Sequence, residues 1–352
     1  MRKRIDYIDT AKGIAILAVV LSHAITNSSN ALETNHPILL NWLSFFNVST
    51  FFFINGFLYN EKSVERPFIA ILKKLKAYYI PYIIYNLFFL IFQNLLVEVH
   101  ILDSSHSLTS LQSFVFALIE VLLGKIQPLT GPMWFLRSLI IISVLYILVD
   151  SLSTKIFGGK FRYIINGIVA IVILLLPYLG YTPNFFNIPA AFRSFIIYYL
   201  GVLYRKYDIN ALIIKHLYII GLVSLVISII IGNTIMVGIY GPINPPMDYL
   251  SMIVSIIFVI SISQFKLISN LNVLKLFGKS SLEIMALHFL AFKPISYLFI
   301  EIYSIDISYL AHTPVIKLSM PDIWPVLYTI SGMHLPVTFY VIKTKVKGRK
   351  HV

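Results

Sequence analysis

Ten stretches of mostly apolar residues, most of them close to twenty residues long, recur along the chain and constrain its fold more than any other feature. A helix that crosses the hydrocarbon core of a bilayer needs about 20 such residues. The stretches cover residues 13–30, 38–59, 79–99, 133–152, 163–180, 188–204, 217–232, 249–262, 282–302 and 323–342. Charged residues make up only 12% of the chain, against about 25% in a soluble domain. The sequence therefore predicts an all-α integral membrane protein with about ten transmembrane helices.

One further apolar stretch, residues 111–123, is too short to be counted with the others. It has 13 residues and carries Glu120. A segment of this length favours an interfacial or re-entrant position over a full crossing.

The distribution of the 28 lysines and arginines tests this count of spans. Twenty-three, Arg162 among them, lie at the two termini and in alternate loops. Lys125 and Lys317 lie in the other loops, and three lie inside predicted spans. Lysine and arginine collect in short cytoplasmic loops. The sequence thus predicts a multi-pass protein of the cell membrane with both termini in the cytoplasm. It also predicts a single membrane domain over residues 1–352, with a short basic tail at 343–352.

The net charge of +13 is accounted for mainly by this topology signal, so the expected partner is the lipid bilayer and not nucleic acid. The chain has no cysteine, which excludes disulfides, thiolate metal sites and cysteine nucleophiles. None of the nine histidines has the close spacing of a metal-ligand set, and we expect no metal.

Lys12 and His23 are the most informative polar residues, because ionisable groups at membrane depth are costly and often mark functional sites. They are 11 residues apart, about three helical turns, so a helix places both on one face and about 16 Å apart along its axis. Lys12 would lie at the cytoplasmic boundary and His23 near the midplane. An extended ligand could then contact both, while Asp9 could pair with Lys12 or with the helix N-terminus.

Each residue alone also has a structural interpretation. His23 could make a hydrogen bond between helices, and Lys12 could be a snorkelling anchor at the headgroups.

A second set of ionisable or aromatic side chains falls inside or at the ends of later spans. Its members are Trp134, Arg137, Arg193, Glu283, His288 and Lys293. The three cations lie in the predicted outer half of the membrane. They could line a cationic, outward-opening cavity that binds a polar or anionic substrate, or they could pair with backbone carbonyls or with Glu120 and Glu301.

The basic cluster Lys73, Lys74 and Lys76 precedes the third span. As a positive-inside signal it needs no further explanation. As a functional feature it would bind the phosphates of a cytosolic cofactor.

Five segments together resemble the membrane-bound acyltransferase 3 family. RIDYIDTAKGIAILAVVLSHA (residues 4–24) matches the family's opening signature, a basic residue followed by ten residues and a histidine. FFFINGFLY (51–59) resembles its second-span motif, with Asn55 where the family more usually has serine. KKLKAYYIPY (73–82) and LFGKSSLEIMALHFL (276–290) resemble later segments. GPMWFLRSL (131–139) is similar to the branch related to fucose 4-O-acetylases.

This resemblance implies a stand-alone family member with ten spans. It implies O-acetylation: transfer of an acyl group, usually acetyl, from acyl-CoA as co-substrate to a hydroxyl of a cell-surface or secreted carbohydrate, such as a polysaccharide or a lipid-linked sugar. His23 would be the essential catalytic residue and Lys12 its partner in donor binding. A histidine can act here as a general base or as a transient acyl carrier, and the sequence leaves both open.

The competing interpretation is a transporter or flippase for a lipid-linked sugar or a polysaccharide intermediate. The many spans and buried cations favour it. The lack of an internal repeat with paired broken helices argues against it. A non-catalytic sensor or scaffold would leave the Lys12–His23 pair unexplained.

Overall fold

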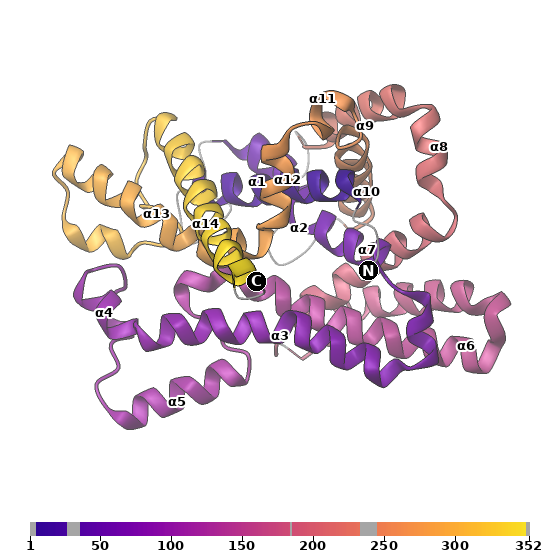
Figure 1. Ribbon diagram of the computed structural model, residues 1–352, viewed down its shortest axis with the longest axis horizontal. Coiled ribbons are helices and arrows are strands. Elements are labelled where there is room, and N and C mark those ends of the chain that lie inside the picture. Colours follow the sequence, from indigo (N-terminus) through magenta and orange to yellow (C-terminus); the bar gives the residue numbers. More distant parts are fainter. Residues whose placement is uncertain (1–4, 27–35, 184, 233–244, 350–352) are drawn as a thin grey trace.

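Every regular element in the described part of the chain is a helix (Figure 1). The computed structural model describes residues 5–26, 36–183, 185–232 and 245–349, and no strand occurs in those ranges. The all-α class predicted from the sequence is therefore confirmed for this part of the chain. Arg2, Lys3 and Arg4 of the basic N-terminus and the last three residues of the predicted tail lie outside the described residues.

Nine longer helices form the body of the described part of the chain. They are α1 (Asp6–Ala24), α2 (Pro37–Phe57), α3 (Pro67–Ile91), α6 (Trp134–Leu175), α7 (Ile188–Lys206), α9 (Leu217–Gly232), α10 (Pro245–Ile262), α13 (Ser281–Tyr303) and α14 (Ile323–Arg349). Shorter helices lie between them: α4 (Gln93–Glu98), α5 (Leu111–Leu122), α8 (Ile209–Lys215), α11 (Lys266–Ser269) and α12 (Asn272–Lys279). Each of the ten predicted spans overlaps one of these nine helices. There are fewer helices than spans because α6 overlaps two of the spans, 133–152 and 163–180.

Five helical segments in the described chain are long and apolar enough to cross a membrane. A sixth is obtained if α8 and α9, which meet at a 96° bend, are counted as one broken span. The protein is thus a multi-pass membrane protein by its helices. The count of ten spans and the cytoplasmic termini remain predictions.

Helix boundaries differ from the predicted spans in three places. The first helix begins at Asp6, well before residue 13, because Asp6 and Asp9 suit the positive end of the helix dipole. The predicted loop between the fourth and fifth spans is helical on both sides of a break at Gly158, which has a φ of +69°. The predicted tail from residue 343 continues α14 as far as Arg349.

At the break at Gly158 the chain folds back, and an acidic residue before the break forms a buried ion pair with a basic residue after it. Asp150 is fully buried, and the Arg162 guanidinium donates two hydrogen bonds of 2.5 Å to its carboxylate. Asn166 and Tyr59 donate two more, each 2.7 Å long. Arg162 was predicted to be a loop cation, and this was wrong: it is 8% exposed, because the break folds it back onto Asp150.

The helix α5 is twelve residues long, too short to cross the bilayer, as its sequence predicted. It packs against α3 (Figure 1), and its apolar side chains Leu111 and Phe116 are largely exposed. The last carbonyls of a helix need hydrogen-bond donors from outside it. The hydroxyl of Tyr79 donates to the carbonyl of Leu122, the last residue of α5 (2.6 Å), and that of Tyr82 donates to the carbonyl of Lys125 in the turn that follows (2.5 Å).

Glycines allow two pairs of helices to approach backbone to backbone. A Cβ added at Gly13 in α1 would collide with the carbonyl of Leu274 in α12, and one at Gly278 would collide with the Asp9 carbonyl. Gly56 in α2 meets the Tyr198 carbonyl of α7 in the same way. The result is a tightly packed centre in which α1 contacts α2, α12, α13 and α14.

Candidate active site

His23 and His288 meet where α1 packs against α13. The Nδ1 atom of His23 lies 3.1 Å from Nε2 of His288, and the two rings are stacked with their centroids 5.2 Å apart. His288 is fully buried, whereas His23 is half-buried. Two residues that the sequence assigned to different roles therefore form one hydrogen-bonded pair, here called the histidine pair.

The hydrogen bonds assign the tautomer of each neutral ring. Nδ1 of His288 lies 2.7 Å from the carbonyl oxygen of Ile284, which can only accept a hydrogen bond, so this nitrogen carries the proton. Nε2 of His288 then has a lone pair and accepts from Nδ1–H of His23. The remaining nitrogen, Nε2 of His23, is left as an unprotonated base.

Aromatic rings fix the orientation of the histidine pair. Phe289 packs edge-on against His23, with ring centroids 5.0 Å apart, and Phe292 packs edge-on against His288 at 5.6 Å. Such packing limits ring rotation and keeps water from the buried side of the pair. Because His23 is half-buried, a ligand can still approach its outer nitrogen.

His23 lies in the last turn of α1, which ends at Ala24. Lys12 lies in the second turn of the same unbroken helix, so the helical argument that places them on one face still holds. Asp9 is buried, Lys12 is half-buried, and each of them has an interaction partner. The pairing of Asp9 with Lys12 stays a prediction.

The basic cluster before the third span divides into exposed and engaged members. Lys73 and Lys76 are exposed at the start of α3. Lys74 donates to the Tyr78 hydroxyl (3.2 Å), which donates to Oδ1 of Asn55 in α2 (2.7 Å). Asn55 thus connects α2 to α3, and Lys73 and Lys76 remain available to a soluble anion.

The three cations of the predicted outer half have different partners in the structure. Arg137 donates to the Gly124 carbonyl at the end of α5 (2.5 Å) and lies over the Phe186 ring, 5.7 Å from its centroid. Arg193 lies over the Tyr178 ring at the same distance. Lys293 donates to two backbone carbonyls. These contacts favour the structural interpretation of Arg137, since an arginine at a helix C-terminus stabilises its carbonyls.

The remaining predicted residues have separate surroundings. Glu283 is 5% exposed and accepts a 2.7 Å hydrogen bond from Lys343 of α14. Trp134 is half-buried at the first turn of α6. Within the described ranges no three histidine or acidic side chains are grouped as a metal site would need, and the expected absence of a metal stays a prediction.

Comparison with known families identifies the chain. A family model described as an acyltransferase domain matches residues 5–342. The chain belongs to the acyltransferase 3 family. No curated protein and no solved structure matches it. The match spans the histidine pair and all ten predicted spans, so it covers the whole arrangement described above.

Sequence reasoning missed two features of this acyltransferase. It did not pair His288 with His23, because their contact depends on how α1 packs against α13. It also placed Asp150 near the end of the fourth span and Arg162 in the loop that follows, and it did not join them in an ion pair. The signal for the second was present, since Gly158 and Gly159 lie between the two charges and permit a reversal of the chain.

Proposed function

We propose that the protein is a membrane O-acyltransferase that moves an acyl group, most simply acetyl, from cytosolic acyl-CoA to a carbohydrate hydroxyl at the cell surface. Membership of the family supports acyl transfer in general. The observation that carries the proposal further is the histidine pair. Its hydrogen bonds leave Nε2 of His23 unprotonated, and the His23 side chain is half-buried, so that a ligand can reach this atom.

The proposed reaction uses this nitrogen as a general base. Nε2 of His23 takes the proton of the acceptor hydroxyl as its oxygen attacks the thioester carbonyl. The carbon–sulfur bond breaks, and the proton passes from the imidazolium to the departing CoA sulfur. The same nitrogen could first take the acyl group itself and then pass it to the hydroxyl. Both routes require Nε2 of His23 to be free.

The donor is proposed to bind along α1. Lys12 would contact the CoA phosphates from the cytoplasmic end, with the exposed Lys73 and Lys76 as further cationic partners. The 16 Å between Lys12 and His23, about three helical turns, suits an extended pantetheine arm. In this arrangement the acyl group crosses part of the membrane without movement of the whole donor, in a ten-span protein with both termini in the cytoplasm.

The test is donor binding and transfer by the purified protein. Radiolabelled acetyl-CoA should bind the protein, and mass spectra of surface glycans should lose one acetyl group per modified sugar when the gene is deleted. A transporter or flippase would bind no donor, and its deletion would reduce the amount of glycan without changing its mass.

His288 is proposed as a positioning residue that acts through His23. Replacing it with alanine should lower kcat about 100-fold, because Nδ1 of His23 loses its acceptor and the ring loses its orientation. The KM for acyl-CoA should change little. His288→Gln offers an amide oxygen as acceptor and should recover part of the activity. Equal losses in the two variants, or a loss confined to KM, would contradict this role.

A further inference from the structure

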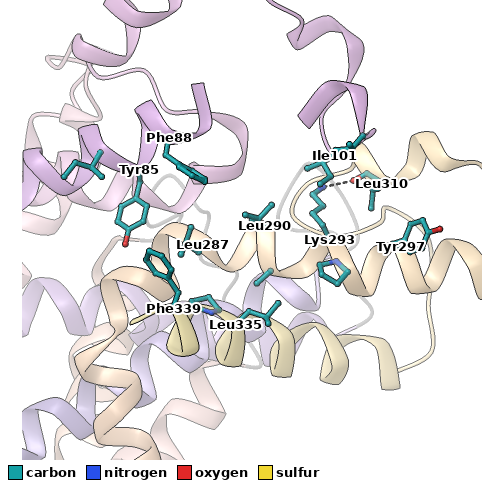
Figure 2. Close-up of a pocket in the computed structure, with 15 residues that line it drawn as sticks. Tyr85, Phe88, Ile101, Leu287, Leu290, Lys293, Tyr297, Leu310, Leu335 and Phe339 are labelled. Carbon is teal, nitrogen blue, oxygen red and sulfur yellow. Dashed lines mark hydrogen bonds between the residues drawn. The ribbon is translucent and has the colours of Figure 1, made fainter. Parts of the chain in front are cut away.

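A groove lies between α3, α13 and α14, and none of the proposed chemistry uses it (Figure 2). Its volume is about 690 Å³, within the usual range for small-molecule sites. Phe88 from α3, Leu290 from α13, and Leu335 and Phe339 from α14 form its walls, and Leu310 closes one end. The lining is almost entirely apolar, so the groove suits a hydrocarbon chain and not a sugar.

The groove faces the lipid side of the helices. Phe88 is 45% exposed, Leu335 50% and Phe339 46%, although all three lie on helices at membrane depth. It also lies on a different face of α13 from the histidine pair, because Leu287, Leu290 and Pro294 line it while His288 projects about 100° around the helix from Leu287. It is therefore a site distinct from the proposed active site.

Among the described residues that line the groove, Lys293 is the one with a charged side chain. It is 3% exposed, and its ammonium donates to the carbonyls of Leu310 and His312, each at 2.7 Å. An ammonium has three donors, and across the described ranges the third has no protein acceptor and no carboxylate lies within 4.0 Å. A buried ammonium without an anion is costly, and a negative charge from outside the protein would offset this cost.

Lys293 lies near the end of the groove that Leu310 closes (Figure 2). His288 lies level with the end of α1, and Lys293 is five residues, about 7.5 Å, farther along α13. Its partners belong to the loop that joins α13 to α14. In that loop, burial together with the nearby Lys317 and Lys293 lowers the pKa of His312, so this end of the groove favours anions.

We propose that the groove binds an acyl chain of an anionic phospholipid and that the lipid phosphate pairs with Lys293. The chain would fill the apolar length between α3, α13 and α14, and the phosphate would take the third N–H of the ammonium. A soluble phosphate would lack the chain that this lining accommodates. The site does not depend on the acyl-transfer reaction, so it can be tested by binding alone.

The experiment measures lipids retained by the full-length protein in native mass spectrometry, after titration with phosphatidylglycerol or phosphatidylcholine. The unaltered protein should retain phosphatidylglycerol about tenfold more tightly. Lys293→Gln keeps donors for the two carbonyls but removes the charge, and it should abolish this preference. Equal affinity for the two lipids, or an unchanged preference in Lys293→Gln, would overturn the proposal.

A second pair of variants tests the groove itself. Leu335→Trp places a large ring inside it, whereas Ile330→Trp makes the same change on α14 outside the lining, at a residue of equal exposure (50% and 51%). Phosphatidylglycerol binding should fall about tenfold in Leu335→Trp and stay unchanged in Ile330→Trp. Equal binding by these two variants would show that the lipid lies elsewhere and would overturn the proposal.

Discussion

Replacing His23 with alanine should reduce acyl transfer by about 10²- to 10⁴-fold, the usual contribution of a general base, or more if His23 carries the acyl group. The reason is that Nε2 of His23 is the unprotonated nitrogen of the histidine pair. The measurement is transfer of label from acetyl-CoA to acceptor glycan by purified protein, at equal amounts of folded enzyme judged by size-exclusion chromatography.

His334→Ala is the matched control for this experiment. His334 also lies on a membrane helix, α14, but it is exposed and packs edge-on against Phe277 rather than against the histidine pair. This variant should keep full activity. If His23→Ala also kept full transfer at normal protein levels, the catalytic assignment would be wrong.

Replacing Asp150 with alanine should destabilise the protein by about 3–5 kcal/mol, the usual cost of leaving one partner of a buried ion pair uncompensated. The carboxylate accepts hydrogen bonds from Arg162, Asn166 and Tyr59, and the variant leaves all of these donors buried. The expected result is a large fall in the midpoint of thermal unfolding in detergent.

The control for Asp150 is an exposed ion pair of the same kind. Glu120 and Lys125 are 2.6 Å apart, with 39% and 59% of their side chains exposed. Such pairs contribute about 0–1 kcal/mol, so Glu120→Ala should change the midpoint little. The double variant Asp150→Leu with Arg162→Met should recover stability lost in Asp150→Ala, because no buried charge remains. A midpoint for Asp150→Ala equal to that of Glu120→Ala would refute this account.

The helices were largely predictable because hydropathy is a local property of the sequence. Each apolar stretch overlaps a helix, and the short stretch at 111–123 forms α5. The number of crossings was harder to predict. The helix α3 carries Lys73, Lys74 and Lys76 in its first turns, and α7 carries Arg193 and ends in Arg205 and Lys206, so neither meets a strict limit on length and hydropathy.

The site was predictable only in part, because its key contacts join residues that are far apart in the chain. Helical spacing placed Lys12 and His23 on one face of α1. The partner of His23 is 265 residues away, and only the packing of α13 against α1 brings His288 to it. Arg137 and Lys293 were identified as unusual, but their carbonyl partners belong to turns whose paths the sequence does not specify.

The two faces of α13 have a consequence for how the protein would respond to its surroundings. Residues of α13 form one wall of the lipid groove, and His288 of the same helix orients the His23 ring. A hydrogen bond of 3.1 Å weakens when its atoms separate by a few tenths of an ångström. If both proposals hold, a lipid that displaces α13 changes the reactivity of His23. Membrane composition would then act as an allosteric effector of acyl transfer.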